Sequence, residues 1–447
     1  MANTVVDKVM RRPVRLVPLA FLGVIAIGTL LLLIPATHHD GQVRPMVATF
    51  TAVSATCITG LTVVDTATYW TPFGQFIILL LTQMGGFGIM SIATLLAILV
   101  KGHIELSGTL VVQTETQTQS LGQARRVVLR IATSMLVAEA VAAVILTLRF
   151  HFTHGTEWPQ AIWHGIWYAG MSFTNAGFAL HSDSIMGFIA DPLTIIVMSV
   201  TVFAGSIGYP VFWELLQKWR RPRNWSVHTR LSFYGFILLF VLTFAAFLIF
   251  EWDNPDTIGS FSVLEKVTAA IAGGVMPRSG GFNIVDYALI KDETTITTIV
   301  MMFIGGGSAG TSGGIKVSTF FLLAFLILAV ARGERDVTVA HRRIGDETLR
   351  QAVTVALLAV ACLVGGTMML AILTNLPLPH VLFDVTSAFG TVGLSMGITP
   401  ELPAGGQITL MVLMFLGRVG TFTAASALAL RTATRHYHLP EERPIVG

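Results

Sequence analysis

The stretch TCITGLT, residues Thr56–Thr62, decides the fold, because three later stretches repeat its small-residue turn around a glycine. They read, in chain order, SFTNAGF (Ser172–Phe178), PRSGGFN (Pro277–Asn283) and GTVGLS (Gly390–Ser395). The four stretches align on Gly60, Gly177, Gly281 and Gly393, which are spaced by 117, 104 and 112 residues. Such a near-constant spacing indicates an internal fourfold repeat, and repeats in a membrane chain point to a site where they meet.

Each glycine turn follows a moderately apolar stretch of ten to fifteen residues. These stretches are Pro45–Ile58, Gln160–Thr174, Phe261–Val275 and His380–Gly390. They are too short to cross a hydrocarbon core of about 30 Å, because a helix rises about 1.5 Å per residue. Each one therefore predicts a re-entrant helix or a buried core helix.

Composition and hydropathy place the whole chain in a membrane. The 447 residues are 53% hydrophobic and 12% charged, with a mean hydropathy of +0.72, whereas soluble domains carry roughly 25% charged residues. Eight longer apolar stretches recur: Val14–Ile34, Phe73–Val100, Val127–Phe150, Leu193–Leu216, Leu231–Phe250, Ile296–Val330, Ala352–Leu373 and Ile408–Leu430. We therefore predict an all-α integral membrane protein with eight transmembrane helices and four re-entrant pore helices around one pore.

The basic residues predict the orientation. Of the 28 Lys and Arg residues, 21 lie in 1–15, 101–130, 218–230, 332–350 and 431–447. These segments all fall on one side of the predicted topology, which the positive-inside rule makes cytoplasmic. Both termini are then cytoplasmic, the first apolar run is a retained helix, and the short helices enter from outside. The net charge of +3 thus reflects topology and does not indicate nucleic acid as a partner.

The repeat divides the chain into 1–107, 108–224, 225–343 and 344–447, each a span, a pore helix, a glycine turn and a span. Glycine suits a turn whose backbone carbonyls replace the hydration shell of an ion. The partly negative C-terminal ends of the short helices favour a cation, and turns without carboxylates fit a monovalent one. The predicted filter comprises Thr59, Gly60, Asn175, Ala176, Gly177, Gly280, Gly281, Val392 and Gly393.

A glycine-rich run interrupts the sixth apolar stretch. It comprises Gly305, Gly306, Gly307, Ser308, Ala309, Gly310, Thr311, Ser312, Gly313 and Gly314. Each glycine costs a helix roughly 1 kcal/mol relative to alanine, so the run predicts an unwound segment that lines a cavity or packs in protein. We interpret it as a gate below the filter, with close packing of small residues as the alternative.

Four charged residues stand out beside these segments. Arg418 lies midway along the last span, which predicts an interior partner and a gate role, or a structural bond to carbonyls of a broken helix. Lys316 ends the glycine run and is either part of the gate or an interfacial lysine. We expect Arg278 to brace the third filter turn, since a cation in the path would repel the ion. Asp65 either attracts cations at the mouth or is a solvated loop carboxylate.

With these motifs in place, the chain resembles the membrane subunit of the Ktr/Trk/HKT superfamily of potassium transporters, in its bacterial KtrB branch. The resemblance covers nearly the whole chain and is carried by TGLTVVD (Thr59–Asp65), QMGGFGIM (Gln83–Met90), GGGSAGTSGGIK (Gly305–Lys316) and FLGRVGTFT (Phe415–Thr423). It implies one pore per subunit, a homodimer, and a cytosolic ring of RCK subunits that binds the regulatory nucleotide. No cofactor is expected in this chain itself, and potassium is the expected substrate.

The expected function is potassium uptake through a gated, channel-like pore in the cell membrane. Plant sodium-selective relatives carry serine at the first filter position, where this chain has Gly60, which favours potassium. A sodium-permeable or sodium-coupled transporter of the same fold is the alternative. An intramembrane enzyme is disfavoured, because Arg418 and Glu139 are the ionisable residues placed within spans and they form no catalytic pair. A receptor would need a soluble output domain, which the sequence lacks.

Overall fold

The computed structural model describes residues 13–39, 41–88, 91, 124–308, 310–334, 336–340 and 342–420. Helices make up nearly all of this structure, and the strands form one small antiparallel pair. The longer elements are α2 (Pro13–Leu32), α5 (Pro72–Phe87), α8 (Ala124–Phe152), α10 (Pro192–Ser206), α11 (Tyr209–Lys218), α12 (Val227–Glu251), α14 (Asp292–Phe303), α15 (Val317–Ala331), α16 (Asp346–Leu373) and α18 (Ala404–Phe415). The minor ones are α4 (Thr66–Tyr69), η1 (Pro35–Thr37), η3 (Met186–Phe188), η4 (Pro222–Asn224), η5 (Met276–Arg278), η6 (Thr399–Glu401), η7 (Leu416–Gly420), β1 (Thr338–Val339) and β2 (Arg342–Arg343).

Within the described residues, three helices are long and apolar enough to cross a membrane: Val128–Phe152, Val227–Glu251 and Asp346–Leu373. The pair α10 and α11 passes the same test together but is bent by 104°. The exposed surfaces of the long helices are rich in Leu, Ile and Val, for example Leu136 and Val141 in α8 and Leu358 in α16. This is expected for helices solvated by lipid. The ends of the predicted spans Phe73–Val100 and Ile408–Leu430 lie outside the described residues, so the full set of eight spans stays a prediction.

Helices occupy all four short stretches that the sequence singles out. They are α3 (Pro45–Thr56), α9 (Trp158–Thr174), α13 (Val263–Val275) and α17 (Leu378–Gly390). Each packs against the long helix that precedes it, in the pairs α2–α3, α8–α9, α12–α13 and α16–α17. Proline at the first turn starts α3, α9 and α17, a position where the missing N–H has no intrahelical partner anyway. A reciprocal capping box between Ser262 and Glu265 starts α13 instead.

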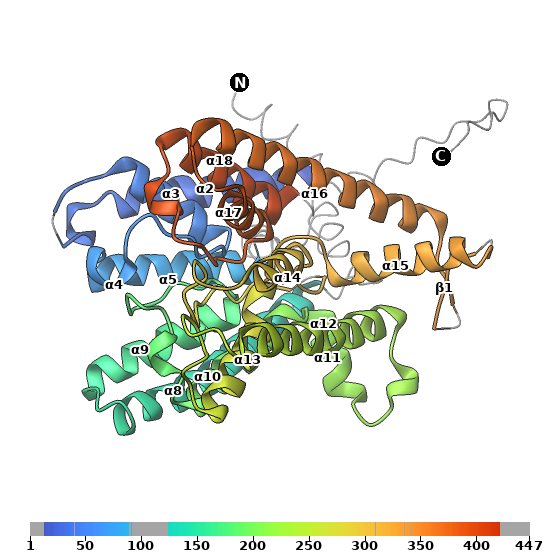
Figure 1. The fold of residues 1–447 in the computed structure, drawn as a ribbon, viewed down its shortest axis with the longest axis horizontal. Coiled ribbons are helices and arrows are strands. Elements are labelled where there is room, and N and C mark those ends of the chain that lie inside the picture. Colours follow the sequence, from blue (N-terminus) through green and yellow to red (C-terminus); the bar gives the residue numbers. More distant parts are fainter. Residues whose placement is uncertain are drawn as a thin grey trace.

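Contacts between consecutive units close a ring. The helix that follows each glycine turn packs against the next short helix, in the pairs α5–α9, α10–α13 and α14–α17. The last such helix, α18, packs against α3 at the beginning of the chain. Figure 1 shows this closure as the red C-terminal helices lying beside the blue N-terminal ones. The four short helices therefore surround one centre, which their C-terminal ends approach.

Within the described residues, the regular α-helix that follows each glycine turn ends before the predicted span does. Helix α5 ends at Phe87, α10 ends at Ser206, α14 ends at Phe303, and α18 passes into the π-helical turn η7. The break at 305–314 agrees with the expected unwinding. The predicted span Leu193–Leu216 is divided in the structure into α10 and α11, which are bent by 104°. It bends because Gly208 adopts a φ of +93° and Pro210 lies in the first turn of the new helix α11, and neither residue can continue α10.

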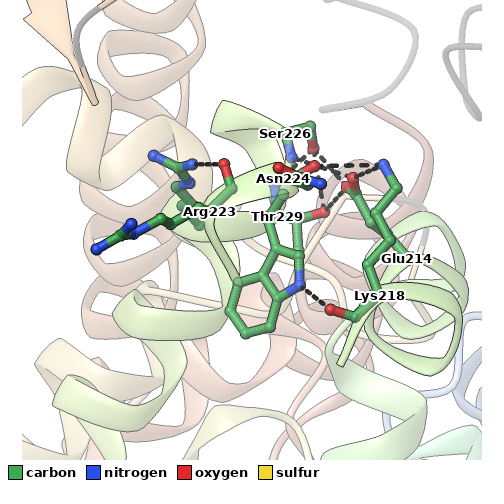
Figure 2. Close-up of polar contacts among 8 residues, drawn as sticks. Glu214, Lys218, Arg223, Asn224, Ser226 and Thr229 are labelled. Carbon is green, nitrogen blue, oxygen red and sulfur yellow. Dashed lines mark hydrogen bonds and ion pairs between the residues drawn. The ribbon is translucent and has the colours of Figure 1, made fainter. Parts of the chain in front are cut away.

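A polar cluster fixes this bend against the next helix (Figure 2). The Glu214 carboxylate of α11 accepts hydrogen bonds from Lys218 Nζ at 2.8 Å, Ser226 Oγ at 2.7 Å and Thr229 Oγ1 at 2.5 Å. Trp225 Nε1 closes the turn by donating to the carbonyl of Lys218 at 3.0 Å. Since Ser226 and Thr229 begin α12, the cluster ties the end of the second unit to the start of the third.

Candidate functional site

The four glycines on which the sequence aligns lie together at the centre of the structure. An added Cβ at Gly60 would lie 2.2 Å from the Ala176 carbonyl oxygen, and at Gly393 it would lie 2.3 Å from that of Thr59. At Gly281 it would lie 2.4 Å from the Val392 carbonyl oxygen, and at Gly177 2.8 Å from Gly281 Cα. These contacts run in the order Gly60, Gly177, Gly281, Gly393 and back to Gly60. We call these four residues the glycine ring; its backbones approach too closely for any side chain.

The chain follows the same backbone path at each ring position. The φ angles of Gly60, Gly177, Gly281 and Gly393 are +86°, +68°, +73° and +98°. Two residues earlier, φ is again positive: +58°, +62°, +91° and +48° at Ile58, Asn175, Ser279 and Thr391. A β-branched residue such as Ile58 or Thr391 avoids this region unless its surroundings enforce it. The conformation is therefore imposed by the site rather than by local preference.

Hydrogen bonds to the short helices fix this path. The N–H groups of Thr59, Ala176 and Val392 donate to carbonyls five residues earlier, at 2.8, 2.9 and 2.9 Å. Because N–H and C=O point in opposite directions across a trans peptide, the carbonyls of the preceding residues point away from the short helices. The third turn differs, since η5 intervenes and Gly280 N donates to the carbonyl of Met276 at 2.8 Å. Backbone oxygens, not side chains, thus dominate the centre.

The helices that follow the ring turns pack closely against the C-terminal ends of the short helices. A Cβ at Gly85, Gly205 or Gly417 would lie 2.2, 1.9 or 1.8 Å from a carbonyl oxygen in the last turn of a short helix. Those three carbonyls belong to Thr56, Phe173 and Phe389, each four residues before a ring glycine. Only glycine permits this approach, so these positions bring the second helix of a unit beside the ring.

The glycine-rich loop, residues 304–316, folds against two of the ring turns. Gly307 N and Thr311 N donate to the carbonyls of Ser206 and Gly205 at 2.8 and 3.2 Å. A Cβ at Gly313 would lie 2.3 Å from Thr391 Oγ1, so the loop touches the fourth turn. The Asn175 side-chain amide bonds the hydroxyls of Ser206 and Ser312 in either of its orientations, which brings the second turn into contact as well.

Backbone bonds also close the loop at its base. Gly305 N donates to the Ile315 carbonyl at 2.8 Å, and Val317 N donates to that of Gly306 at 3.0 Å. Most of the loop is buried, although Ser308 and Gly310 are partly exposed. The predicted gate residue Ala309 lies outside the described residues. The loop is thus a compact folded segment rather than an extended linker.

Arg418 and Lys316 both attach to this loop. Arg418 donates through Nη1 to the Thr311 carbonyl and through Nη2 to the Gly85 carbonyl, the latter at 3.0 Å. Lys316 Nζ donates to the Ser312 carbonyl at 2.7 Å. The guanidinium of Arg418 therefore links the fourth unit to the loop of the third and to the interrupted helix of the first. It has interior partners, as its place within an apolar stretch requires.

Arg278 and Asp65 stand beside the ring, not in it. Arg278 is 1% exposed, stacks over the Phe236 ring at 4.4 Å and donates to the Phe236 carbonyl at 3.0 Å. Asp65 caps α4 through the Ala67 N–H at 3.0 Å and accepts from Ser182 Oγ at 2.5 Å. The arginine thus anchors the third turn to α12. The carboxylate joins the segments that follow the first and second ring glycines.

Sequence reasoning missed two side chains of the short helices that reach the segments just after a ring glycine. Asp384 in α17 is fully buried and bonds residues just after Gly393. Tyr168 in α9 is also fully buried; its hydroxyl accepts from Leu180 N at 3.1 Å and contacts His181 Nδ1 at 2.6 Å. Burial lowers the pKa of His181, which favours a neutral ring whose Nδ1 accepts a hydrogen bond from the tyrosine hydroxyl. A lone carboxylate in an apolar short helix was the signal available for Asp384.

Backbone oxygens gathered at the centre of a helical membrane protein define a class, because such oxygens bind cations. Among the described residues, no group of three or more His, Cys, Asp or Glu side chains could hold a metal ion. The oxygens beside the ring belong to backbone carbonyls, which differ from the carboxylate ligands that divalent metal sites usually gather. These are the features of a cation transport protein.

Comparison with known proteins agrees. The family model TrkH, described as a cation transport protein, matches residues 9–433. The chain is 33% identical over 448 residues to the Ktr system potassium uptake protein B of Bacillus subtilis, covering 99% of both chains. It is 31% identical over 454 residues to the potassium/sodium uptake protein NtpJ of Enterococcus hirae, covering 99% of this chain and 100% of that one. The crystal structure of the potassium transporter TrkH from Vibrio parahaemolyticus shares the fold, with a TM-score of 0.65, 18% identity and coverage of 92% and 84% of the two chains.

The chain therefore belongs to the TrkH family of cation transport proteins. This confirms the expected superfamily and the expectation of a transporter rather than an enzyme.

Two glycines of one strand test the importance of the ring. Gly393 and Gly397 both have positive φ, +98° and +84°, but only at Gly393 would a Cβ overlap another atom; nothing lies within 4 Å of one at Gly397. We expect Gly393→Ala to lower cation transport by roughly tenfold or more, because overpacking costs about 1–3 kcal/mol. Gly397→Ala suffers backbone strain alone and should keep transport near the wild-type rate. Equal transport by the two folded variants in proteoliposomes would show that the ring is not on the path.

Proposed function

We propose that the chain takes up potassium through a gated, channel-like pore whose selectivity filter is the glycine ring with its adjoining carbonyls. The single observation that carries the proposal is the mutual approach of Gly60, Gly177, Gly281 and Gly393, with carbonyl oxygens beside them. A full-length relative at 33% identity is named a potassium uptake protein, which supports the same ion. The sequence shows no phosphate-binding loop or nucleophile elbow in a strand–helix context, so we infer that an ion gradient or a partner supplies the driving force.

The physical argument starts from dehydration. An ion that enters a narrow path loses water and needs oxygens at matched positions, which fixed carbonyl dipoles supply without reorganisation. The turns carry no carboxylate, which keeps the attraction weak enough for a monovalent ion to leave again. The C-terminal ends of α3, α9 and α17 approach the ring, and their partly negative dipoles favour a cation there. Thr59, Asn175, Ala176, Gly280 and Val392 contribute the neighbouring backbone.

Replacing Gly60 by serine tests the ion preference. The new Cβ would lie 2.2 Å from the Ala176 carbonyl oxygen, so it should displace that oxygen and lower the preference for potassium over sodium by roughly tenfold. Gly41→Ser is the matched control, because Gly41 also has a positive φ of +65° but no atom within 4 Å of an added Cβ. Uptake of each ion is measured separately in cells that lack other potassium systems. An unchanged preference in Gly60→Ser would remove Gly60 from the filter.

The alternative is a sodium-permeable or sodium-coupled transporter of the same fold. It is favoured by one observation, the name of the relative from Enterococcus hirae, a potassium/sodium uptake protein. The same uptake experiment separates the two functions. Comparable rates for potassium and sodium in the wild-type protein, or potassium uptake that requires sodium, would favour the alternative.

We further propose that the glycine-rich loop and Arg418 form the gate. The loop contacts the turns at Asn175 and Thr391, so it lies next to the proposed path. Backbone carbonyls of the loop and of α5 hold Arg418, whose charge would add an electrostatic barrier to a cation. A regulatory partner that favours another loop conformation would open the path by a population shift.

Two changes should therefore raise potassium flux in the absence of any partner. One is deletion of part of Gly306–Gly313, and the other is Arg418→Gln, which removes the charge and the bond to the Thr311 carbonyl. Arg332→Gln, at an exposed arginine where α15 ends, is the control and should leave the flux unchanged. Flux is measured in proteoliposomes with variants that elute as the wild type does. Equal or lower flux in the folded deletion would mean that the loop is packing material.

The final part of the proposal concerns assembly and location. We infer a homodimer in the cell membrane with cytoplasmic termini, regulated by a cytosolic RCK ring that binds the nucleotide. Exposed arginines near α15, β2 and α16 offer a docking surface for that ring: Arg332, Arg342, Arg343 and Arg350. Purification in mild detergent should yield a dimer that binds the ring. A monodisperse monomer with full regulated activity would refute the assembly.

A further inference from the structure

The Asp384 carboxylate accepts all of its hydrogen bonds from the segment that follows Gly393 in the chain. Its Oδ1 accepts from Met396 N at 3.0 Å, and its Oδ2 accepts from Ser395 Oγ at 2.8 Å and Thr399 Oγ1 at 2.7 Å. The carboxylate is 0% exposed and belongs to α17, the short helix of the same unit. One side chain thus fixes three points of the segment that begins two residues beyond the ring.

Within the part of the chain that the structure describes, no lysine or arginine pairs with this carboxylate, and His380, one turn earlier in α17, is the basic side chain that interacts with it electrostatically. Its oxygens meet one amide and two hydroxyl groups. Burial of an unpaired carboxylate is costly, so the site retains it against a stability penalty. The buried charge lies behind a ring strand, where its field favours a cation at the ring.

The second unit carries an equivalent brace. Tyr168 and Asp384 each lie nine residues before their ring glycine, and each bonds the N–H three residues after it, that of Leu180 or Met396. The ring runs from Gly60 through Gly177 and Gly281 to Gly393. The two segments held in this way, those after Gly177 and Gly393, therefore lie opposite each other. The same position holds Thr51 in the first unit and Ala272 in the third, and alanine offers no acceptor. The ring is thus braced unequally.

We propose that Asp384 is a positioning residue that sets potassium affinity and the preference for potassium over sodium. It acts by holding the 395–399 turn, which keeps the Gly393 strand from closing around a smaller ion. Fixed oxygen spacing is what separates potassium from sodium in a carbonyl cage. The inference rests on the proposed filter, and it adds to that filter a side chain that never touches the ion.

Asp384→Asn tests this with Glu251→Gln as the matched control. Glu251 is also 0% exposed, and its carboxylate accepts from Asn254, Thr257, Thr294 and the Lys291 N–H. Glu251 ends α12 at a distance along the chain from any ring turn, so neutralising it perturbs a buried carboxylate without touching a ring strand. Initial rates of potassium and sodium uptake into proteoliposomes give KM and Vmax for both variants.

We expect Asp384→Asn to raise the potassium KM and to lower the preference over sodium, each by about tenfold, the size of one lost hydrogen bond to a charged group. Vmax should change less, since the ring remains in place. Glu251→Gln should unfold at a lower temperature with unchanged KM and preference. A folded Asp384→Asn with wild-type KM and preference, or equal shifts in both variants, would overturn the proposal.

A second variant keeps the carboxylate and removes its partners. Ser395→Ala combined with Thr399→Val should shift KM and preference in the same direction, which keeps the test decisive if Asp384→Asn does not fold. Wild-type values in this double variant would count against the positioning role. If Gly60→Ser changes the preference while these variants do not, this inference fails alone. If Gly60→Ser also leaves it unchanged, the proposed filter fails first.

Discussion

The close approach of four backbone segments at the glycine ring is the constraint on which the rest of the structure depends. At these positions an added Cβ would come within 2.2–2.8 Å of a neighbouring backbone atom, so the chain must place glycine in each of four units. Irregular backbone at membrane depth survives only when its polar groups are bonded or line a polar path. The short helices meet this requirement by accepting the N–H groups of Thr59, Ala176 and Val392. The ring, its strained turns and the helices that end at it are therefore one arrangement.

The same constraint explains why the helices beyond the ring are interrupted. Gly85, Gly205 and Gly417 approach carbonyls at the ends of short helices within distances that exclude a side chain, and glycine weakens a helix where it is used. Arg418 donates to two backbone carbonyls near these breaks, that of Gly85 in the last turn of α5 and that of Thr311 in the glycine-rich loop. In the third unit the glycine-rich loop follows the helix instead. It hydrogen-bonds the end of α10 and contacts the ring turns at Asn175 and Thr391. A charge that is costly in lipid is thereby held by backbone oxygens from two other units.

The sequence was sufficient for features that repeat locally. Four glycines in register, the short helices before them and the unwinding at 305–314 follow from period, length and glycine content. The bend between α10 and α11 was missed, because Gly208 and Pro210 were read as part of one apolar run. The partners of Arg418 lie 107 and 333 residues away in the chain, and no local pattern names them. Asp384 carried a local signal, as a lone carboxylate in an apolar short helix, but its partners become visible only when α17 is seen beside the segment after Gly393. The filter and gate roles themselves remain predictions.

Direct observation of an ion at the glycine ring tests the central claim. Thallium(I), which substitutes for potassium and scatters anomalously, can be exchanged into crystals of the protein and located by its anomalous signal. The account predicts a peak on the axis between Gly60, Gly177, Gly281 and Gly393, coordinated by backbone carbonyl oxygens and displaced by excess potassium. A ring without a peak, with thallium bound instead at carboxylates such as Glu139 or Asp384, would contradict it.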